Sequence, residues 1–411
     1  MARIKQIDVY FTLLFATIWM LTTACQPNTT ASATEEIVAE PEAPALQTGA
    51  EQLETYLPQL SGKRVGMVVN HTSQVGDQHL VDTLHARGIN ITRIFAPEHG
   101  FRGEADAGAS IADGKDRTTG APITSLYGTT KKPSPEHLAN LDVVVFDIQD
   151  VGVRFYTYIS TMTYVMEACA EQNIPFMVLD RPNPNGHYTD GPVLDPDYSS
   201  FVGMHPVPVV HGMTVGEYAR MVNGEGWLAG GVQADLSVIQ CANYTHETPY
   251  ELPIKPSPNL PNMRSIYLYP SICFFEPTKV SVGRGTDKQF QLLGMPGASF
   301  GDYTFLPIPK PGAQKPKHEG RECTGLDLTS LPVDSVRQWA GLNLTYLVDV
   351  YQSIEEKSSF FTSDSFFDKL AGGPGLRQKL TSGASAEEIK ASWQADLEEY
   401  RAMRAGYLFY P

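Results

Sequence analysis

Short apolar runs alternate with helical patterns between about residue 60 and residue 240. The runs are rich in valine, isoleucine and phenylalanine, which is typical of strands buried on both faces of a parallel sheet. Between the runs, apolar residues recur at the spacing of one helix face, as Leu80, Val81 and Leu84 do. The pattern indicates an α/β domain at 51–240. It predicts strands at 64–70, 91–96, 142–148, 174–179, 207–210 and 235–240, and helices at 77–88, 157–172 and 214–228.

The pattern changes after residue 240. Prolines and glycines are dense from about 241 to 330, which predicts irregular, loop-dominated structure. Helical patterns return at 334–354 and at 385–400, and the second begins with a capping box in which Ser385 and Glu388 satisfy free amides. We therefore expect an irregular segment and a smaller α+β domain within 241–411, with a cleft between the two domains.

The N-terminus has the pattern of an export signal. Arg3 and Lys5 precede an apolar run at 9–21, which is too short to span a membrane comfortably. The sequence L-T-T-A-C resembles a bacterial lipoprotein cleavage site with Cys25 as the lipidated residue, although the leucine lies one position further away than usual. We expect a signal peptide at 1–25 and a disordered tether at 26–50, with secretion without a lipid as the alternative.

Composition narrows the classes of partner. The 411 residues include 31 basic and 46 acidic ones, and the resulting net charge of −15 argues against a nucleic-acid partner. An anionic substrate would need a local arginine to hold it. Four further cysteines are far apart in the sequence, so free buried thiols are favoured and pairing stays open.

Polar side chains follow the predicted strands at their carboxyl ends, where open parallel sheets bind ligands. No single position is informative, because acids and amides after strands also cap helices and form turns. Their repetition predicts a pocket lined by acids, amides and a few bases. Its members are His71, Glu98, His99, Asp147, Gln149, Asp150, Arg154, Asp180, Arg181, Asn183 and His211.

Short catalytic motifs exclude more than they support. The chain contains no phosphate-binding G-x-x-x-x-G-K-[ST] and no zinc-binding H-E-x-x-H. Residues 297–301, G-A-S-F-G, match the serine-nucleophile pattern, but the prolines around Ser299 do not fit the strand and helix that this motif needs. The loose histidines His71, His99 and His211 give no metal-ligand spacing with Glu98.

Two glutamates suit glycoside hydrolysis. That chemistry needs one carboxylic acid to protonate the leaving oxygen and a second group to attack, stabilise charge or activate water. Glu98 lies in a tight turn at a strand end and suits the acid, with a helix cap or a salt bridge as the competing interpretation. Glu276 follows an apolar stretch, and Gly283-Arg284-Gly285 presents an arginine on a bare backbone that suits an anion.

Several long stretches, taken together, resemble a known family. The sequence is similar to the exo-β-N-acetylmuramidases of glycoside hydrolase family 171, with one departure at Pro277, where the family usually has glycine. The matching stretches are F-A-P-E-H-G-F-R-G (95–103), F-D-I-Q-D-V-G-V-R-F-Y-T-Y (146–158), L-D-R-P-N-P-N-G (179–186), H-G-M-T-V-G-E (211–217), P-S-P-N-L-P (256–261) and F-E-P-T-K-V-S-V-G-R-G-T (275–286).

The resemblance implies removal of terminal N-acetylmuramic acid from the non-reducing end of peptidoglycan fragments. It implies a Rossmann-like α/β domain, a smaller α+β C-terminal domain, an active site in the cleft between them and no cofactor. Glu98 and Glu276 are then the catalytic candidates. The lactyl carboxylate of muramic acid needs an arginine, for which Arg284 is favoured over Arg154. The substrate-binding candidates are His71, His99, Arg102, Asp147, Gln149, Asp150, Arg154, Tyr156, Asp180, Arg181, Asn183, His211, Asn259, Arg284 and Asp287.

Several alternatives stay open. The substrate's own acetamido group, oriented by an aspartate, competes with Glu276 as the second catalytic group. A lipoprotein that binds peptidoglycan fragments without cleaving them is the alternative to an enzyme, and a serine esterase using Ser299 is a weaker one. The expected partner is a muropeptide or a disaccharide of N-acetylmuramic acid and N-acetylglucosamine. The expected location is the periplasm or outer membrane of a bacterium, with the chain anchored through Cys25.

Overall fold

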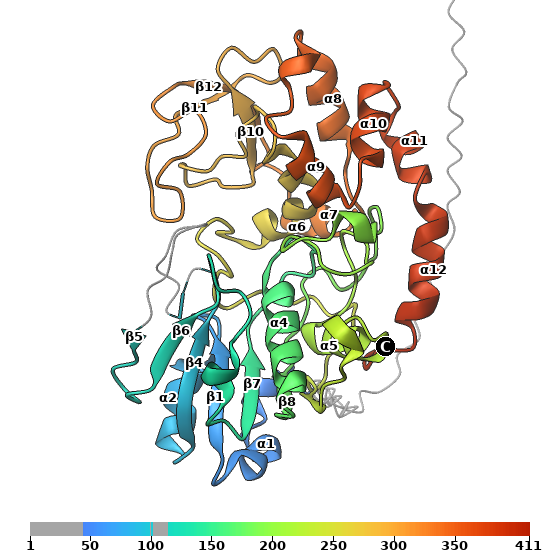
Figure 1. Cartoon of the computed structure of the whole chain (residues 1–411). Helices are drawn as coiled ribbons and strands as arrows, with labels where there is room; N and C mark the ends of the chain where they lie inside the picture. The colour runs from blue at the N-terminus through green and yellow to red at the C-terminus, as the bar shows by residue number, and fades with distance from the viewer. Residues whose placement is uncertain (1–43, 99, 102–113) are drawn as a thin grey trace, which may run out of the picture. The chain divides into compact units, whose positions relative to one another are not determined.

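A computed structural model describes residues 44–98, 100–101 and 114–411 (Figure 1). Residues 45–411 form one compact unit. The alternation of strands and helices predicted for the first half of this unit is confirmed. Its central sheet has the order β5 (Gly114–Lys115), β6 (Pro122–Ser125), β4 (Asn90–Ala96), β1 (Arg64–Val69), β7 (Val143–Asp147), β8 (Phe176–Leu179) and β9 (Leu236–Ile239).

The sheet is parallel except at one edge. Every neighbouring pair from β6 to β9 is parallel, whereas β5 pairs with β6 in the antiparallel direction. The chain starts at β1 in the middle, builds outward through β4 to β6, and then returns to the other side of β1 with β7. This is the Rossmann-like order, and it places the topological switch point between β1 and β7, where open sheets form a crevice at their carboxyl ends.

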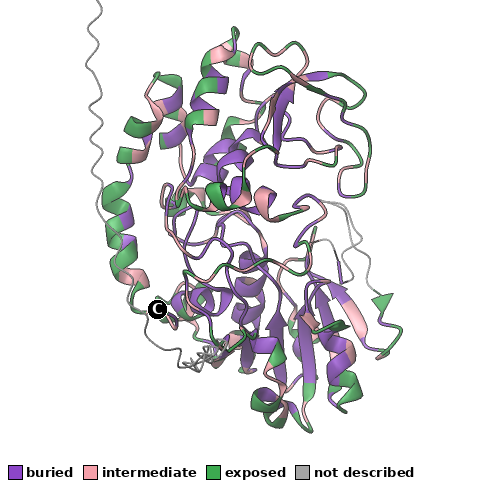
Figure 2. Ribbon diagram, turned by 180° about the vertical axis from the view of Figure 1, so that it is seen from behind, coloured by how far each residue is buried: buried purple, intermediate pink, exposed green. Residues whose placement is uncertain are grey.

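Alternate residues of a strand pack into two separate hydrophobic cores, one on each face of the sheet. In β7, Val143 and Val145 pack on the face covered by α1 (Leu53–Leu60) and α2 (Leu80–Ala86). Val144 and Phe146 pack on the face covered by α4 (Tyr158–Glu171) and α5 (Val215–Gly224). Both faces are therefore apolar, which explains why the strands appear in the sequence as continuous apolar runs. Figure 2 shows the central strands of this sheet largely buried, whereas the edge strand β5 is exposed.

The C-terminal part continues the second of these cores. It contains α6 (Met263–Ile272) and a small antiparallel sheet of order β10 (Leu292–Met295), β12 (Cys323–Asp327) and β11 (Tyr303–Phe305). One hydrophobic cluster runs from the α4 face of the large sheet into these elements, so the two parts share a core. The remaining helices are α3 (Pro135–Leu138), which lies before β7, and α7 (Val333–Arg337), α8 (Thr345–Ser353), α9 (Asp364–Ala371), α10 (Gly375–Thr381), α11 (Ala386–Ala391) and α12 (Gln394–Arg404).

The predicted disordered tether at 26–50 extends too far, because Gln47 forms a bridge with Ala242 and Gly49–Glu51 form a 3-10 helix within the compact unit. Three predicted elements also differ from the structure in detail. The predicted strand at 207–210 is not a strand of the sheet, since Val210 makes only isolated bridges. The predicted helix at 334–354 is divided into α7 and α8, with Ala340 between them at a φ of 44°. The predicted helix at 385–400 begins with the expected capping box at Ser385 but breaks near Trp393, whose indole donates to buried Asp190 at 2.9 Å.

The end of the chain returns to the large sheet. The Tyr410 hydroxyl donates to Asp180 Oδ2 at 2.7 Å and accepts from the backbone amide of Cys241 at 2.8 Å. Buried Glu217 accepts from the amide of Phe409 at 2.8 Å. The last residues therefore fix the C-terminal part to the carboxyl end of β8. No helix within the described ranges is long and apolar enough to cross a membrane.

Candidate active site

A cavity of about 240 Å³ lies between the carboxyl end of the large sheet and the C-terminal part. Its floor is buried and largely aromatic, and its rim is half-buried or exposed. The floor consists of Phe155, Tyr156, Tyr158, Ser257, Asn259, Leu260, Tyr269, Cys273, Phe290 and Leu370, and the rim of Glu98, Tyr127, Thr157, Phe201, Val202, Glu276, Arg284 and Phe366.

Glu98 enters this pocket from the turn after β4. Its Oε2 accepts a hydrogen bond from the hydroxyl of Thr157 at 3.0 Å. Thr157 is the N-cap residue of α4 but makes no side-chain cap, so its hydroxyl serves the glutamate instead of the helix. Burial and the nearby charge of Glu98 raise the pKa of the Tyr158 hydroxyl well above its ordinary value. The start of α4 therefore fixes both Glu98 and the adjoining floor.

Glu276 lines the same pocket from the turn after Phe275 and is ion-paired. Arg284 Nε donates to Glu276 Oε1 at 2.9 Å, and the two side chains are 27% and 24% exposed. The guanidinium of Arg284 also lies over the ring of Phe290, 5.1 Å from its centroid. Within the described residues this is the only hydrogen bond of the Arg284 side chain, and a guanidinium has five N–H donors. The pocket is thus lined by two carboxylates and by an arginine with unused N–H donors.

Two further predicted residues lie in the floor. The Tyr156 hydroxyl donates to the carbonyl of Pro256 at 2.8 Å. Asn259 donates through Nδ2 to the carbonyl of Gly312 at 2.8 Å, and its Oδ1 is buried with no hydrogen-bond partner within the described residues. A buried acceptor without a donor is costly, and a substrate hydroxyl or amide N–H would satisfy it. Of the sequence-predicted set, the pocket brings together Glu98, Tyr156, Asn259, Glu276 and Arg284.

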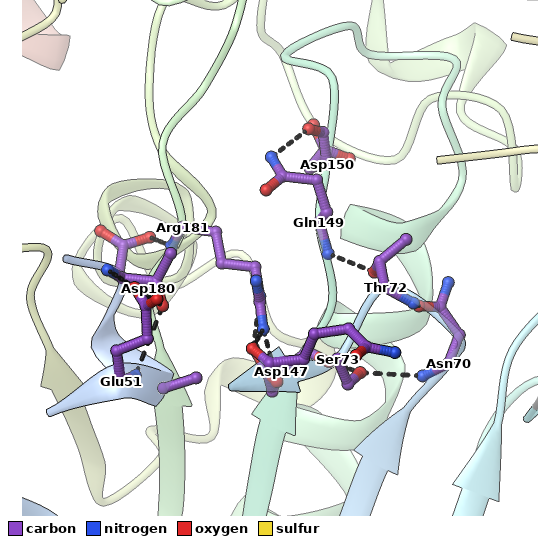
Figure 3. Close-up of polar contacts among 12 residues, drawn as sticks. Glu51, Asn70, Thr72, Ser73, Asp147, Gln149, Asp150, Asp180 and Arg181 are labelled. Carbon is purple, nitrogen blue, oxygen red and sulfur yellow. Dashed lines mark hydrogen bonds and ion pairs between the residues drawn. The ribbon is translucent and has the colours of Figure 1, made fainter. Parts of the chain in front are cut away.

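Most of the other strand-end residues bind one another instead (Figure 3). Arg181 forms a two-pronged ion pair with Asp147, at 2.6 and 2.9 Å, and both side chains are buried. Gln149 donates to the carbonyls of Asp150 and Pro182 at 2.8 and 2.7 Å. These contacts join the segments at the carboxyl ends of β7 and β8, next to the switch point between β1 and β7. These residues are not among those that line the pocket, and the expectation that Asp147, Gln149, Asp150 and Arg181 contact substrate stays a prediction.

Asp180 and Asn183 have structural partners of their own. Asp180 accepts from the hydroxyl of Thr214 at 2.7 Å and from the backbone amide of Gly216 at 2.8 Å, beside the N-terminus of α5. Asn183 donates to the carbonyl of Met213 at 2.8 Å and accepts from a backbone amide two residues later. Both residues lie outside the pocket lining. They therefore correspond to the cap and turn interpretation of polar residues after strands.

Arg154 is also placed differently from the prediction. Its guanidinium is fully buried and donates to the backbone carbonyls of Pro192, Val207 and Leu370 at 2.6 to 3.0 Å. It joins the large-sheet part to α9 and has no access to the pocket. Among the described residues, Arg284 is the arginine that lines the pocket.

The remaining predicted residues lie outside the pocket lining or outside the described residues. His211 is fully buried, and burial lowers its pKa to about 3. His71 contacts the carbonyl of Lys255 at 2.9 Å, and Asp287 is paired with Lys310. Positions 99 and 102, predicted as substrate-binding, lie outside the described residues, as does the predicted lipidation site at position 25.

Sequence reasoning missed most of the aromatic lining. Tyr127, Phe201 and Phe366 form part of the rim, and Tyr269 and Phe290 form part of the floor. These residues come from segments far apart in the chain, and each has the ordinary appearance of a core aromatic. Only Tyr269 and Phe290 lie close in sequence to the predicted Glu276 and Arg284.

The described residues do not form the serine-nucleophile site or the metal site that the sequence left open. Ser299 is exposed, donates to the carbonyl of Ser353 at 3.1 Å and lies outside the pocket lining. Residues 44–98, 100–101 and 114–411 contain no group of three or more histidine, cysteine, aspartate or glutamate side chains arranged to hold a metal ion. The described cysteines, Cys169, Cys241, Cys273 and Cys323, are buried and free.

Comparison with known proteins agrees with this arrangement. Residues 65–264 match the N-terminal domain model of exo-β-N-acetylmuramidase NamZ, and residues 267–410 match the C-terminal domain model of the same family. The peptidoglycan β-N-acetylmuramidase NamZ of Bacillus subtilis (strain 168) is 40% identical over 392 residues, which is 89% of this chain and 92% of the relative.

Two solved structures have the same fold. A DUF1343 family protein from Bacteroides fragilis, solved at 1.30 Å, is 47% identical and superposes with a TM-score of 0.83 over 89% of this chain and 99% of its own. A second DUF1343 family protein from the same species is 29% identical, with a TM-score of 0.71 and the same coverage of both chains. The two domain models together span nearly all of the compact unit. The chain belongs to the NamZ family of exo-β-N-acetylmuramidases.

Proposed function

We propose that this protein removes terminal N-acetylmuramic acid from the non-reducing end of peptidoglycan fragments. The observation that carries the proposal is one pocket lined by two glutamates, with an arginine paired to one of them. Family membership supplies the substrate class, because the related protein of Bacillus subtilis is named as a peptidoglycan β-N-acetylmuramidase. A pocket with a buried floor suits an exo-acting enzyme, since the floor accepts one terminal sugar and the rim faces the rest of the saccharide.

We assign the two glutamates different roles. Glu276 is ion-paired with Arg284, and an ionised carboxylate is what a nucleophile or a general base requires. Glu98 accepts from a neutral hydroxyl at the start of α4 and is the candidate for the general acid that protonates the leaving oxygen. The spare N–H donors of Arg284 would hold the lactyl carboxylate, as a fork-shaped guanidinium binds carboxylates well. The buried Oδ1 of Asn259 would accept from a substrate N–H or hydroxyl.

The test is hydrolysis of a chromogenic N-acetylmuramic acid β-glycoside, run beside the N-acetylglucosamine analogue. We expect turnover of the muramic acid substrate only, and a loss of about a hundredfold or more in kcat for Glu98→Gln. Glu136→Gln is the matched control, because Glu136 is exposed on α3 and outside the pocket. Binding of the disaccharide by a folded wild type without any turnover would contradict the enzymatic role and favour a binding protein.

Arg284→Lys separates recognition of the lactyl group from catalysis. A lysine retains the positive charge but loses the fork of donors, so it can no longer bind Glu276 and a second carboxylate in the same geometry. We expect the preference for muramic acid over N-acetylglucosamine to fall by about tenfold or more. An unchanged preference would show that another group reads the lactyl carboxylate.

We also propose that the chain is exported and lipid-anchored through Cys25, as the sequence L-T-T-A-C suggests. Metabolic labelling with a radioactive fatty acid in a bacterial host tests this. We expect label in the wild type and none in Cys25→Ser. Equal labelling of both, or of neither, would contradict lipidation at this cysteine.

A further inference from the structure

The loop between β11 and β12, residues 306–322, contacts segments that line the pocket. Gly312 in this loop accepts a hydrogen bond from the floor residue Asn259 at 2.8 Å. Ile308 donates its amide to the carbonyl of Gly285 at 3.0 Å, directly after Arg284. The pocket lining includes no residue from 306–322. The loop therefore contacts two of the segments that carry candidate site residues without reaching the cavity itself.

Lys317 of this loop contacts the segment that carries Glu276. Its Nζ donates to the carbonyl oxygens of Phe275 at 3.3 Å, Glu276 at 3.1 Å and Val280 at 2.9 Å, and also to that of Thr278. Within the described residues, Lys317 is the only hydrogen-bond donor to the carbonyls of Glu276, Thr278 and Val280. An ammonium has three N–H donors and no acceptor, so at least one of its hydrogens is shared between two of the four carbonyl oxygens.

These carbonyls belong to a segment outside the named helices and strands, where Thr278 forms an isolated bridge with Phe361 and the amide of Lys279 donates to the carbonyl of Phe360 at 2.9 Å. The short helical turn before Glu276 ends at Phe275, and residues 276–280 belong to no helix or strand. Without Lys317, several backbone acceptors of this segment would lack a donor. Glu276 is the first residue of the segment, and its carboxylate must meet Arg284 and the pocket. The conformation of the segment therefore decides where that carboxylate lies.

We propose that Lys317 is a positioning residue for catalysis: its ammonium, bound in the cage of carbonyl oxygens at 275–280, fixes the backbone that aims Glu276 into the pocket. The proposal rests on the catalytic role of Glu276 proposed above. Lys317 itself is outside the pocket lining and has no contact with the expected position of the substrate.

Burial, together with neighbouring charges, makes the role of Lys317 sensitive to pH. Glu276, Arg284 and His318 are the titratable or charged groups that act on or respond to it. Burial lowers the pKa of Lys317 to about 8, Glu276 acts in the opposite direction, and Arg284 adds to the lowering. Below this value the ammonium offers three donors to the cage. As pH rises through it, a neutral amine with only two donors remains, and we expect kcat to fall.

The first experiment compares Lys317→Met with Lys315→Met, an exposed lysine of the same loop. Displacement of a catalytic group by about 1 Å costs on the order of a hundredfold, so we expect a fall of that size in kcat for Lys317→Met, with KM within about threefold of wild type. Lys315→Met should behave as wild type. A folded Lys317→Met variant with wild-type kcat would overturn the proposal.

The second experiment tests the cage by chemical rescue. Lys317→Ala leaves space for a small cation, and ethylammonium supplies N–H donors where tetramethylammonium supplies none. We expect ethylammonium, and not tetramethylammonium, to restore part of kcat. Equal effects of the two ions would overturn the proposal, because charge or space alone would then account for the loss.

A third variant covers the case in which Lys317→Met and Lys317→Ala do not fold. Lys317→Arg retains the charge at alkaline pH, so the alkaline fall in kcat should move from about pH 8 to a higher value. A fall that stays in place would overturn the proposal. Glu276→Gln, measured in parallel, separates the two proposals: if it is fully active, the role of Glu276 fails, whereas if it is inactive and Lys317→Met is active, only the role of Lys317 fails.

Discussion

The buried ion pair between Arg181 and Asp147 gives a quantitative test of what the strand-end residues do. Asp147 is 0% exposed and Arg181 is 4% exposed. Their two hydrogen bonds are 2.6 and 2.9 Å long, and Arg181 also donates to the carbonyl of Gln74 at 3.0 Å. Asp147→Asn removes the counter-charge while preserving the size of the side chain. Arg181 then stays buried with no compensating charge from Asp147.

The expected cost follows from the burial of both groups. Removing one partner of a buried pair destabilises a protein by about 3–5 kcal/mol, because the remaining charge is desolvated and uncompensated. Unfolding entropy is about 2.1 cal/mol/K per residue, or roughly 0.8 kcal/mol/K for a unit of this size, so the Tm should fall by about 4–6 °C. The double variant Asp147→Leu, Arg181→Met removes both charges and should recover most of the loss, because apolar replacements of a buried pair are often neutral.

Thermal unfolding of the wild type and of both variants, followed by circular dichroism, measures these shifts. A fall of less than about 1 °C in Asp147→Asn, or a double variant less stable than the single one, would refute the argument from uncompensated charge. Activity on the muramic acid glycoside at 25 °C should stay near the wild-type value in the folded double variant. A loss of more than about tenfold there would instead place the pair in the substrate site.

Three further predictions follow from other contacts. Tyr410→Phe removes the hydrogen bond to buried Asp180 and should lower the free energy of unfolding by about 1–3 kcal/mol, measured by urea denaturation, whereas an unchanged midpoint would contradict a structural role for this hydroxyl. Phe366→Ala removes a 39%-exposed aromatic side chain from the rim of the pocket. It should raise KM for the natural disaccharide by about threefold or more and leave KM for a short aryl glycoside nearly unchanged. Equal changes in the two KM values would argue against contact with the leaving sugar. Burial raises the pKa of the Asp150 carboxyl from its ordinary value of 3.8 to about 7. The stabilising effect of the protonated carboxyl is therefore complete below pH 3.8 and is lost as pH rises through about 7. Asp150→Asn should flatten the decline in Tm between pH 4 and 7, and an unchanged slope would contradict this assignment.

The sequence was most informative where local pattern and structure have the same cause. Strands β1, β4, β7, β8 and β9 lie within two residues of their predicted bounds, because continuous apolar runs are what a sheet buried on both faces requires. The order of these strands was not accessible, since a run at 64–69 carries no mark of lying in the middle of the sheet. The helices α11 and α12 show the limit: their apolar stripe is continuous, but the contact of Trp393 with Asp190 divides them.

For the candidate site, too, some features follow from the sequence and others only from the tertiary structure. The sequence by itself determined the family, both candidate glutamates and Arg284, because each lies in a long stretch whose residue order is specific. It also determined that polar side chains would gather at the carboxyl ends of the strands. Only the tertiary structure decided which of those side chains face a pocket: Arg181 and Asp147 neutralise each other, while Glu98 and Glu276 come from segments far apart in the chain to line one cavity. A residue's type is a local property, but whether its charge meets another side chain or a substrate depends on distances in space that the local sequence does not encode.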